Sequence, residues 1–203
     1  NVNGWGTTSL KQWHNLDSTK YYGAPFLSFN YVTLNPPFSL PDNQWFYQHS
    51  RNGNGVAGFD FIWYSSSTSP WKRSLARTKL VSQLIGGKTY CAKMYVNPQD
   101  KFGYATDGIA MYFDNGQLDT IMAIDSSGVY PFVNPQVSNP SGNILNDTMN
   151  WVSVSGTFVA TGTETFLTIG NFKTNANTNL VLIDPSYTDS ASSLLNDDVS
   201  VIE

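Results

Sequence analysis

The run Asp197-Asp198-Val199-Ser200-Val201-Ile202-Glu203 is the stretch that decides the fold class. A pair of acidic residues followed by alternating small and aliphatic residues is typical of a β-strand that closes a sandwich. The alternation puts Val199 and Val201 on one face of the strand and Ser200 and Ile202 on the other. An acidic residue at the entrance of such a strand can also reach a bound cation. The run therefore indicates a β-sandwich surface module, not the core of an enzyme.

Similar patterns recur along the chain between Gly, Pro, Asn and Asp residues, whereas helical periodicity is nearly absent. We therefore predict an all-β sandwich. The predicted strands are residues 56–64, 75–84, 88–97, 107–114, 151–160, 165–172 and 198–202. Two turns that contain glycine, residues 85–88 and 160–162, are predicted to close β-hairpins.

The length of 203 residues predicts one domain, because single sandwiches commonly reach this size. Residues 1–50 are rich in aromatic residues but interrupted by prolines, so we expect loops that pack on the sandwich through aromatic burial. Residues 51–203 should form the sandwich core. Residues 65–70 and 123–146 read as further loops, and the start at Asn1 is expected to be that of a processed or excised fragment.

The composition favours neutral polar partners such as sugars. Charged residues make up 13% of the chain, against about 25% in an average domain. The net charge of −4 does not provide the basic surface that nucleic acid or an anionic membrane requires. No apolar run reaches the length of a membrane-spanning helix. The single cysteine, Cys91, has no partner for an internal disulfide and is expected to be a small buried side chain of a strand.

Several motifs, in order, resemble one family of surface domains. The main motifs are residues 139–148 (NPSGNILNDT), 151–158 (WVSVSGTF), 166–172 (FLTIGNF) and the terminal run, with supporting motifs at residues 53–58, 87–91, 105–113 and 176–178. Together they resemble the jelly-roll, carbohydrate-binding-module-like domain at the front of outer-membrane-protein-A-like and gliding-associated proteins of bacteria that use type IX secretion. The resemblance covers about residues 50 to 203.

The resemblance implies an extracellular or cell-surface jelly roll of two antiparallel sheets, associated with the outer membrane but not inserted into a membrane, and without catalysis. It also implies one structural calcium ion near the terminal strand, for which Asp198 and Asp107 are the predicted ligands. This chain lacks the opening Asn-Pro-x-Phe-Glu strand that supplies calcium ligands in many relatives. The alternative is that Asp197 and Asp198 only cap and solvate the entrance of the strand.

A sugar site needs a flat aromatic ring surrounded by amides and carboxylates. Trp71, in a Pro-Trp-Lys-Arg tip, is the best candidate for an exposed ring, whereas Trp151 is expected in the core. Asp60 lies inside an apolar strand and is either a hydrogen-bonded structural residue or part of a site. The predicted ligand-binding residues are Trp63, Trp71, Tyr104, Asp60 and Arg73.

The sequence offers little for catalysis. His14 and His49 are the only histidines and lie in no zinc-binding spacing, and no Gly-x-Ser-x-Gly motif is present. Glu164 and Glu203 are the only glutamates, so the acid pair of a glycosidase would have to come from aspartates. We therefore predict that the chain is not an enzyme.

Three Asp-Ser/Thr-aliphatic runs match the pattern that the same bacterial phylum uses for O-glycosylation. They predict glycans on Thr120, Thr148 and Ser190, although such short patterns also recur by chance.

Three hypotheses for the function follow. The first is a non-catalytic module that binds a glycan or surface polysaccharide, or mediates adhesion. The second is a structural subunit of an outer-membrane or filamentous surface assembly, whose partner is another surface protein. The third, a polysaccharide-cleaving enzyme, has the least support, because the sequence shows no paired-acid cleft.

Overall fold

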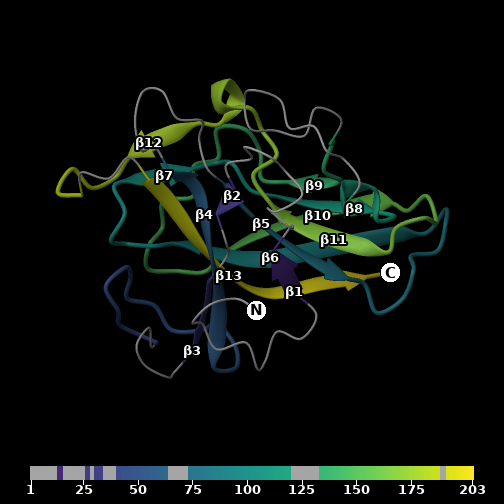
Figure 1. Cartoon of the computed structure of the whole chain (residues 1–203), viewed down its shortest axis with the longest axis horizontal. Helices are drawn as coiled ribbons and strands as arrows, with labels where there is room; N and C mark the ends of the chain where they lie inside the picture. The colour runs from purple at the N-terminus through teal and green to yellow at the C-terminus, as the bar shows by residue number, and fades with distance from the viewer. Residues whose placement is uncertain are drawn as a thin grey trace.

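The computed structural model describes residues 13–15, 26–27, 30–33, 40–63, 73–119, 133–187 and 191–203. These residues form two layered β-sheets joined by loops and short 3-10 turns (Figure 1). All strand pairs are antiparallel except one, so the prediction of an all-β sandwich of two antiparallel sheets is confirmed. None of the described helical segments has the length and apolar character that a membrane crossing requires.

The first sheet follows the order β1-β5-β11-β8-β9, and β2 pairs with β5 in parallel. Its strands are β1 (Trp13–Asn15), β2 (Phe26–Leu27), β5 (Arg73–Lys79), β8 (Ala110–Asp114), β9 (Val137–Ser138) and β11 (Phe166–Gly170). The second sheet follows the order β10-β6-β13-β4-β3. Its strands are β3 (Asn30–Thr33), β4 (Gly55–Trp63), β6 (Thr89–Pro98), β10 (Val152–Val159) and β13 (Ala191–Ile202).

A separate two-stranded pair, β7 (Tyr104–Thr106) with β12 (Leu180–Leu182), lies at the end of the molecule away from the C-terminus (Figure 1). Two 3-10 turns are described, η2 (Gln117–Asp119) and η3 (Asn175–Asn177).

The main core lies between the two sheets and is built by strand alternation. In β8, Met111 and Phe113 are buried in this core, so Ala110, Tyr112 and Asp114 lie on the outer face. The Phe113 ring stacks on Phe158 of the second sheet, with centroids 4.7 Å apart. The core therefore draws its side chains from both sheets.

The closing strand behaves as its alternation predicts. Val199 and Val201 pack against the core, and Ile202 is exposed. The strand begins at Ala191, however, seven residues before the predicted start at Asp198. A bulge between Asp197 and Ser200 shifts the pairing with β6, so the alternation that the sequence shows is only that of the last segment.

The expectation of loops throughout residues 1–50 is wrong at three short strands. β1 and β2 belong to the first sheet, and β3 belongs to the second. Among the aromatic residues described from Leu40 onward, Phe46 is buried and Trp45 is partly buried, whereas Tyr47 is exposed. Leu40 and Phe46 form a second, smaller core with Val56 and Leu195 on the outside of the second sheet, and two tryptophans, Trp45 and Trp151, pack partly against it.

The two predicted hairpins are wrong, because each turn joins strands of different sheets. Residues 80–88 connect β5 to β6, and residues 160–165 connect β10 to β11. The two connections lie side by side: Gly87 N donates to Ala160 O (2.8 Å), and Ala160 N donates to Lys88 O (2.9 Å). A sequence shows that a turn is present, but only the tertiary structure shows which sheet each neighbouring strand joins.

Cys91 is exposed, so its predicted burial is wrong. In β6 the alternation sends Tyr90, Ala92 and Met94 into the core, and Cys91 therefore faces outward with Lys93.

Candidate functional site

The loop of residues 171–179, which follows β11, is folded by its own polar side chains. Thr174 caps η3, because its Oγ1 accepts a hydrogen bond from Asn177 N (3.2 Å). Thr178 Oγ1 donates to Thr174 O (2.9 Å) and accepts from Asn171 Nδ2 (3.2 Å). These contacts give the loop a defined shape before any ligand binds.

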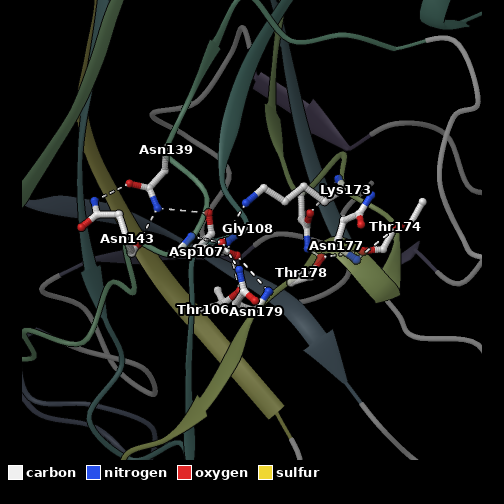
Figure 2. A network of polar contacts seen from close by, with 12 residues as sticks. Thr106, Asp107, Gly108, Asn139, Asn143, Lys173, Thr174, Asn177, Thr178 and Asn179 are labelled. Atoms are coloured by element: carbon white, nitrogen blue, oxygen red, sulfur yellow. Dashed lines mark hydrogen bonds and ion pairs between the residues drawn. The ribbon is translucent and has the colours of Figure 1, made fainter.

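Asp107, just after β7, anchors this loop (Figure 2). Its buried carboxylate accepts hydrogen bonds from Gly142 N (2.8 Å), Asn179 Nδ2 (2.6 Å) and Asn179 N (3.0 Å). Lys173 Nζ forms an ion pair with Asp107 Oδ2 at 2.9 Å, but the angles of this contact are not those of a hydrogen bond. Burial raises the pKa of Asp107, but the hydrogen bonds from Gly142 and Asn179 and the adjacent Lys173 ammonium outweigh it and hold this pKa below its usual value.

A third segment joins the network from the other side of Asp107, where Figure 2 shows Asn139 and Asn143. Asn139 Nδ2 donates to Asp107 O (3.1 Å) and to Asn143 O (2.8 Å), and Asn143 Nδ2 donates to Asn139 Oδ1 (2.7 Å). Gly108 completes the junction, because a Cβ there would lie 2.7 Å from Asn171 Nδ2. Three segments distant in sequence therefore meet around one carboxylate.

A cavity of about 240 Å³ opens beside this network. Its wall includes Ala110 and Ser138, which are paired across β8 and β9, and Asn171, Phe172 and Lys173 of the loop. The remaining lining residues are Gly108, Ile109, Val133, Asn134 and Pro135. The site is thus a small hollow with apolar, amide and hydroxyl groups and one charged residue, Lys173.

Arg73 and Asp107, two of the predicted site residues, both hold the 171–179 loop. Arg73 begins β5, and its Nη2 donates to Asn175 Oδ1 (2.6 Å). The Arg73 side chain is only 1% exposed, so the structure gives it a partner inside the protein. Its contact with a ligand stays a prediction.

Asp60 and Tyr104, two other predicted ligand residues, are not among the described residues that line the cavity. Asp60 is half-buried on β4, and burial raises its pKa more than the hydrogen bond with Ser193 lowers it. Tyr104 begins β7 and pairs with Leu182 of β12. Trp71 and the side chain of Trp63 lie outside the described residues, so the predicted roles of both tryptophans stay predictions.

Asp198 lies far in sequence from Asp107 and has different partners. It sits at the bulge of β13 with a φ of +51°, and its Oδ2 accepts hydrogen bonds from Arg51 Nη1 and Asn52 Nδ2. Asp197 Oδ2 accepts from Arg51 N (2.9 Å), and the Arg51 guanidinium lies 3.6 Å from the centre of the Tyr95 ring. The acid pair therefore holds the turn before β4.

No group of three or more His, Cys, Asp or Glu side chains comes together within the described part of the chain. Asp107 and Asp198 share no partner there. A structural calcium ion stays a prediction.

Both glutamates are engaged within the protein, and one of the three predicted glycosylation sites lies among the described residues. Glu164 is buried between the sheet connections, where its carboxylate accepts hydrogen bonds from Thr161 N and Gly162 N, and Glu203 pairs with Lys88. Thr148 is half-buried in the turn before β10. Thr120 and Ser190 lie outside the described residues.

Sequence reasoning missed the residues that shape the cavity, although the run Asn171 to Asn179 has a signal in its four asparagines and two threonines.

Sequence reasoning also missed the ion pair on the outer face of the first sheet. Both Asp114 carboxylate oxygens accept from Arg77, at 2.6 and 2.8 Å, and Arg77 also donates to Thr168 Oγ1 (2.7 Å). Charged residues in two predicted strands were the available signal.

Neither a protein-family model nor a curated protein matches this sequence. Solved structures of similar fold include the K3 cleaved adhesin domain of Lys-gingipain from Porphyromonas gingivalis W83, at 14% identity and a TM-score of 0.47, covering 94% of this chain and 89% of that one. A family 16 carbohydrate-binding module has 15% identity and a TM-score of 0.43, covering 100% and 98%.

A third similar structure holds the CBM22-1 and GH10 modules of xylanase 10B from Clostridium thermocellum, complexed with xylohexaose. It has 14% identity and a TM-score of 0.45, and the match covers 95% of this chain but 26% of the xylanase fragment. These structural neighbours are carbohydrate-binding modules and an adhesin domain. At such identities and TM-scores the likeness does not say what this chain binds.

Proposed function

We propose that this chain is a non-catalytic carbohydrate-binding module whose cavity at the 171–179 loop takes one sugar residue. The observation that carries the proposal is the lining of the cavity. Phe172 and Pro135 offer apolar surface to the C–H groups of a sugar, and Asn134 and Ser138 offer neutral hydrogen-bonding groups to its hydroxyls.

The charge and the size of the cavity favour a single neutral sugar. Lys173 is the one charged lining residue, and Asp107 balances its charge at 2.9 Å. The volume of about 240 Å³ is below the roughly 300–1,000 Å³ of pockets for larger ligands. The network around Asp107 fixes the walls in advance, which lowers the ordering cost of binding.

The test is a glycan array with the 203-residue chain, followed by calorimetry with the best oligosaccharide. Asn134→Ala should weaken binding about fivefold to tenfold, the loss of about one hydrogen bond. Ser138→Phe should abolish binding by filling the cavity. Ser153→Phe, on the exposed face of β10 in the other sheet, is the matched control. Equal binding by the wild type and Ser138→Phe would refute the cavity as the site.

A second candidate function is an interaction subunit, which β12 favours. Val181 and Leu182 are exposed on this strand, and β12 pairs only with β7 among the described strands. An extended segment of another surface protein can add to such an edge. Val181→Lys should abolish capture of that protein by the immobilised chain without changing glycan binding.

The resemblance supports three further proposals: an extracellular or cell-surface location associated with the outer membrane, a calcium ion bound with Asp198 or Asp107, and O-glycans on Thr120, Thr148 or Ser190. Calcium should raise the unfolding temperature of chelator-treated protein. Native material should exceed the mass of the bare polypeptide. An unchanged unfolding temperature or an unmodified mass would count against the respective proposal.

A further inference from the structure

A surface on the second sheet's side of the molecule carries exposed rings that the cavity does not use. It is formed by Tyr47, His49, Met149 and Trp151, and we call these four residues the aromatic platform. They come from the loop that leads to β4 and from the turn that precedes β10. None of them lines the cavity, which belongs to β8, β9 and the 171–179 loop.

Tyr47 is the most informative member of the platform. It is 54% exposed and is the one aromatic residue among the large, exposed apolar side chains of the described residues. Its hydroxyl has no hydrogen-bond partner within that part of the chain. The ring meets His49 edge to face, with centroids 5.9 Å apart and an angle of 87° between the planes. Exposure of an apolar ring to water is unfavourable, so a ligand that covers the ring gains free energy.

Trp151 extends the platform beyond His49. Its Nε1 donates to His49 O (3.2 Å), and part of its indole packs against the smaller core. The indole is therefore held in place while remaining half-exposed. Met149, which is 81% exposed, lies two residues before it and adds apolar surface.

The backbone below these side chains is fixed by hydrogen bonds. Gln48 is nearly buried, and its Oε1 accepts from His49 N (2.9 Å) while its Nε2 donates to Met149 O (3.3 Å). Asp147 Oδ1 accepts from Met149 N (3.0 Å), and Asp100 Oδ1 accepts from Tyr47 N (3.0 Å). The smaller core anchors the same loop through Phe46. Because the backbone is already fixed, ordering these loops on binding costs little conformational entropy.

The charges nearby select the chemical class of the ligand. The neighbouring cations are engaged: Lys101 Nζ bonds Asp42 Oδ1 (3.0 Å), and Arg51 bonds Asp198. No free positive charge is therefore offered here by these cations to an anionic polymer or lipid. Exposed rings without a free cation beside them suit the C–H faces of pyranose rings, and the nearby carboxylates of Asp100 and Asp147 add hydrogen-bond acceptors for sugar hydroxyls.

We propose that the aromatic platform is a second saccharide-binding surface, which stacks sugar rings of a neutral polysaccharide chain on Tyr47 and Trp151. It is an exposed surface and not a cavity of about 240 Å³, so it can bind along a polymer. The cavity and the platform lie on different segments, and each can bind without the other. With both occupied, the module gains avidity for an insoluble polysaccharide.

The test measures retention of the full chain by a panel of neutral polysaccharides: microcrystalline cellulose, xylan, mannan and laminarin. Tyr47→Ala should weaken binding to at least one of them fivefold to tenfold, whereas Tyr47→Phe should stay within twofold of the wild type. Tyr187→Ala is the matched aromatic control outside the platform. Circular dichroism establishes that each variant is folded, and Trp151→Ala is left out because its indole also packs on the smaller core.

The cavity variant Ser138→Phe separates this proposal from the proposed function. If Tyr47→Ala loses polysaccharide binding and Ser138→Phe keeps it, the platform is a site of its own. If Ser138→Phe abolishes all binding and Tyr47→Ala changes none, the platform proposal is overturned and the cavity stands. If the wild type binds no member of the panel, the platform proposal is also overturned.

Discussion

Among single residues, Asp107 is the one on which the candidate site depends. Its carboxylate accepts from two backbone amides and one side-chain amide and faces Lys173 at 2.9 Å. Asp107→Asn keeps the size of the side chain but removes the charge and turns one acceptor into a donor. A buried partner lost in this way costs about 3 kcal/mol.

We therefore expect Asp107→Asn to lower the free energy of unfolding by that amount, as measured in urea. Asp147→Asn is the matched control, because Asp147 caps an exposed turn through Oδ1, which asparagine retains, and the substitution removes only the exposed bond that Oδ2 accepts from Asn150 Nδ2 (3.0 Å). It should cost less than about 1 kcal/mol. Equal effects of the two substitutions would contradict the central role of Asp107.

Asp60 makes a prediction about pH. Burial raises its pKa in the folded protein above the unfolded value of about 4. The folded state then binds this proton more tightly than the unfolded state does, so Asp60 favours folding more as the pH falls from the folded pKa toward the unfolded one. The stability of the wild type minus that of Asp60→Asn should rise over this interval. Urea unfolding of both proteins from pH 7 to pH 4 measures it, and a constant difference would contradict the burial of the charge.

At the scale of elements, the paired connections between the sheets depend on a close approach of two backbones. Gly162 has a φ of +89°, and a Cβ there would lie 2.9 Å from Gly86 N. Gly87 has a similar φ of +79°, but its Cβ would meet nothing within 4 Å. The two glycines therefore separate backbone strain from steric conflict.

Gly87→Ala should cost about 1 kcal/mol from the left-handed conformation alone. Gly162→Ala should cost more, about 2–4 kcal/mol, because the two connections must also move apart. Thermal and urea unfolding of both variants measures this difference. Equal losses would show that the connections separate easily.

For the whole molecule, the shared core predicts cooperative unfolding. Phe113 of the first sheet stacks on Phe158 of the second, and the core between the sheets contains residues of both. Neither sheet can therefore keep its buried face when the other unfolds. We expect one transition, with tryptophan fluorescence and far-ultraviolet circular dichroism changing together. Two separated transitions would contradict the prediction of one domain.

The sequence predicted elements better than it predicted their arrangement. Seven predicted strands correspond to β4, β5, β6, β8, β10, β11 and β13, since each has a pattern of strand-favouring residues that extends over five or more positions. The strands β7, β9 and β12 have only two or three residues and show no such pattern. The hairpin predictions failed because a turn looks the same whether the chain stays in one sheet or crosses to the other.

For the candidate site, the sequence pointed to individual residues but not to their partners. Asp107 was predicted as a calcium ligand and Arg73 as a ligand-binding residue, but their partners Asn179 and Asn175 lie 72 and 102 residues away. Cys91 was expected inside because cysteine is apolar, and the pleat of β6 turns it outward.

The sequence by itself determined the all-β class, most of the strands and the inward face of the last segment of β13, because side-chain alternation is a local property of a strand. Only the tertiary structure decided which strands are neighbours, how the cavity is walled and which rings stay exposed. These features depend on contacts between distant segments: Asp107 meets Gly142 and Asn179, and Gln48 meets Met149, because the fold of the two sheets brings their loops together. No local sequence pattern shows which distant segments come into contact.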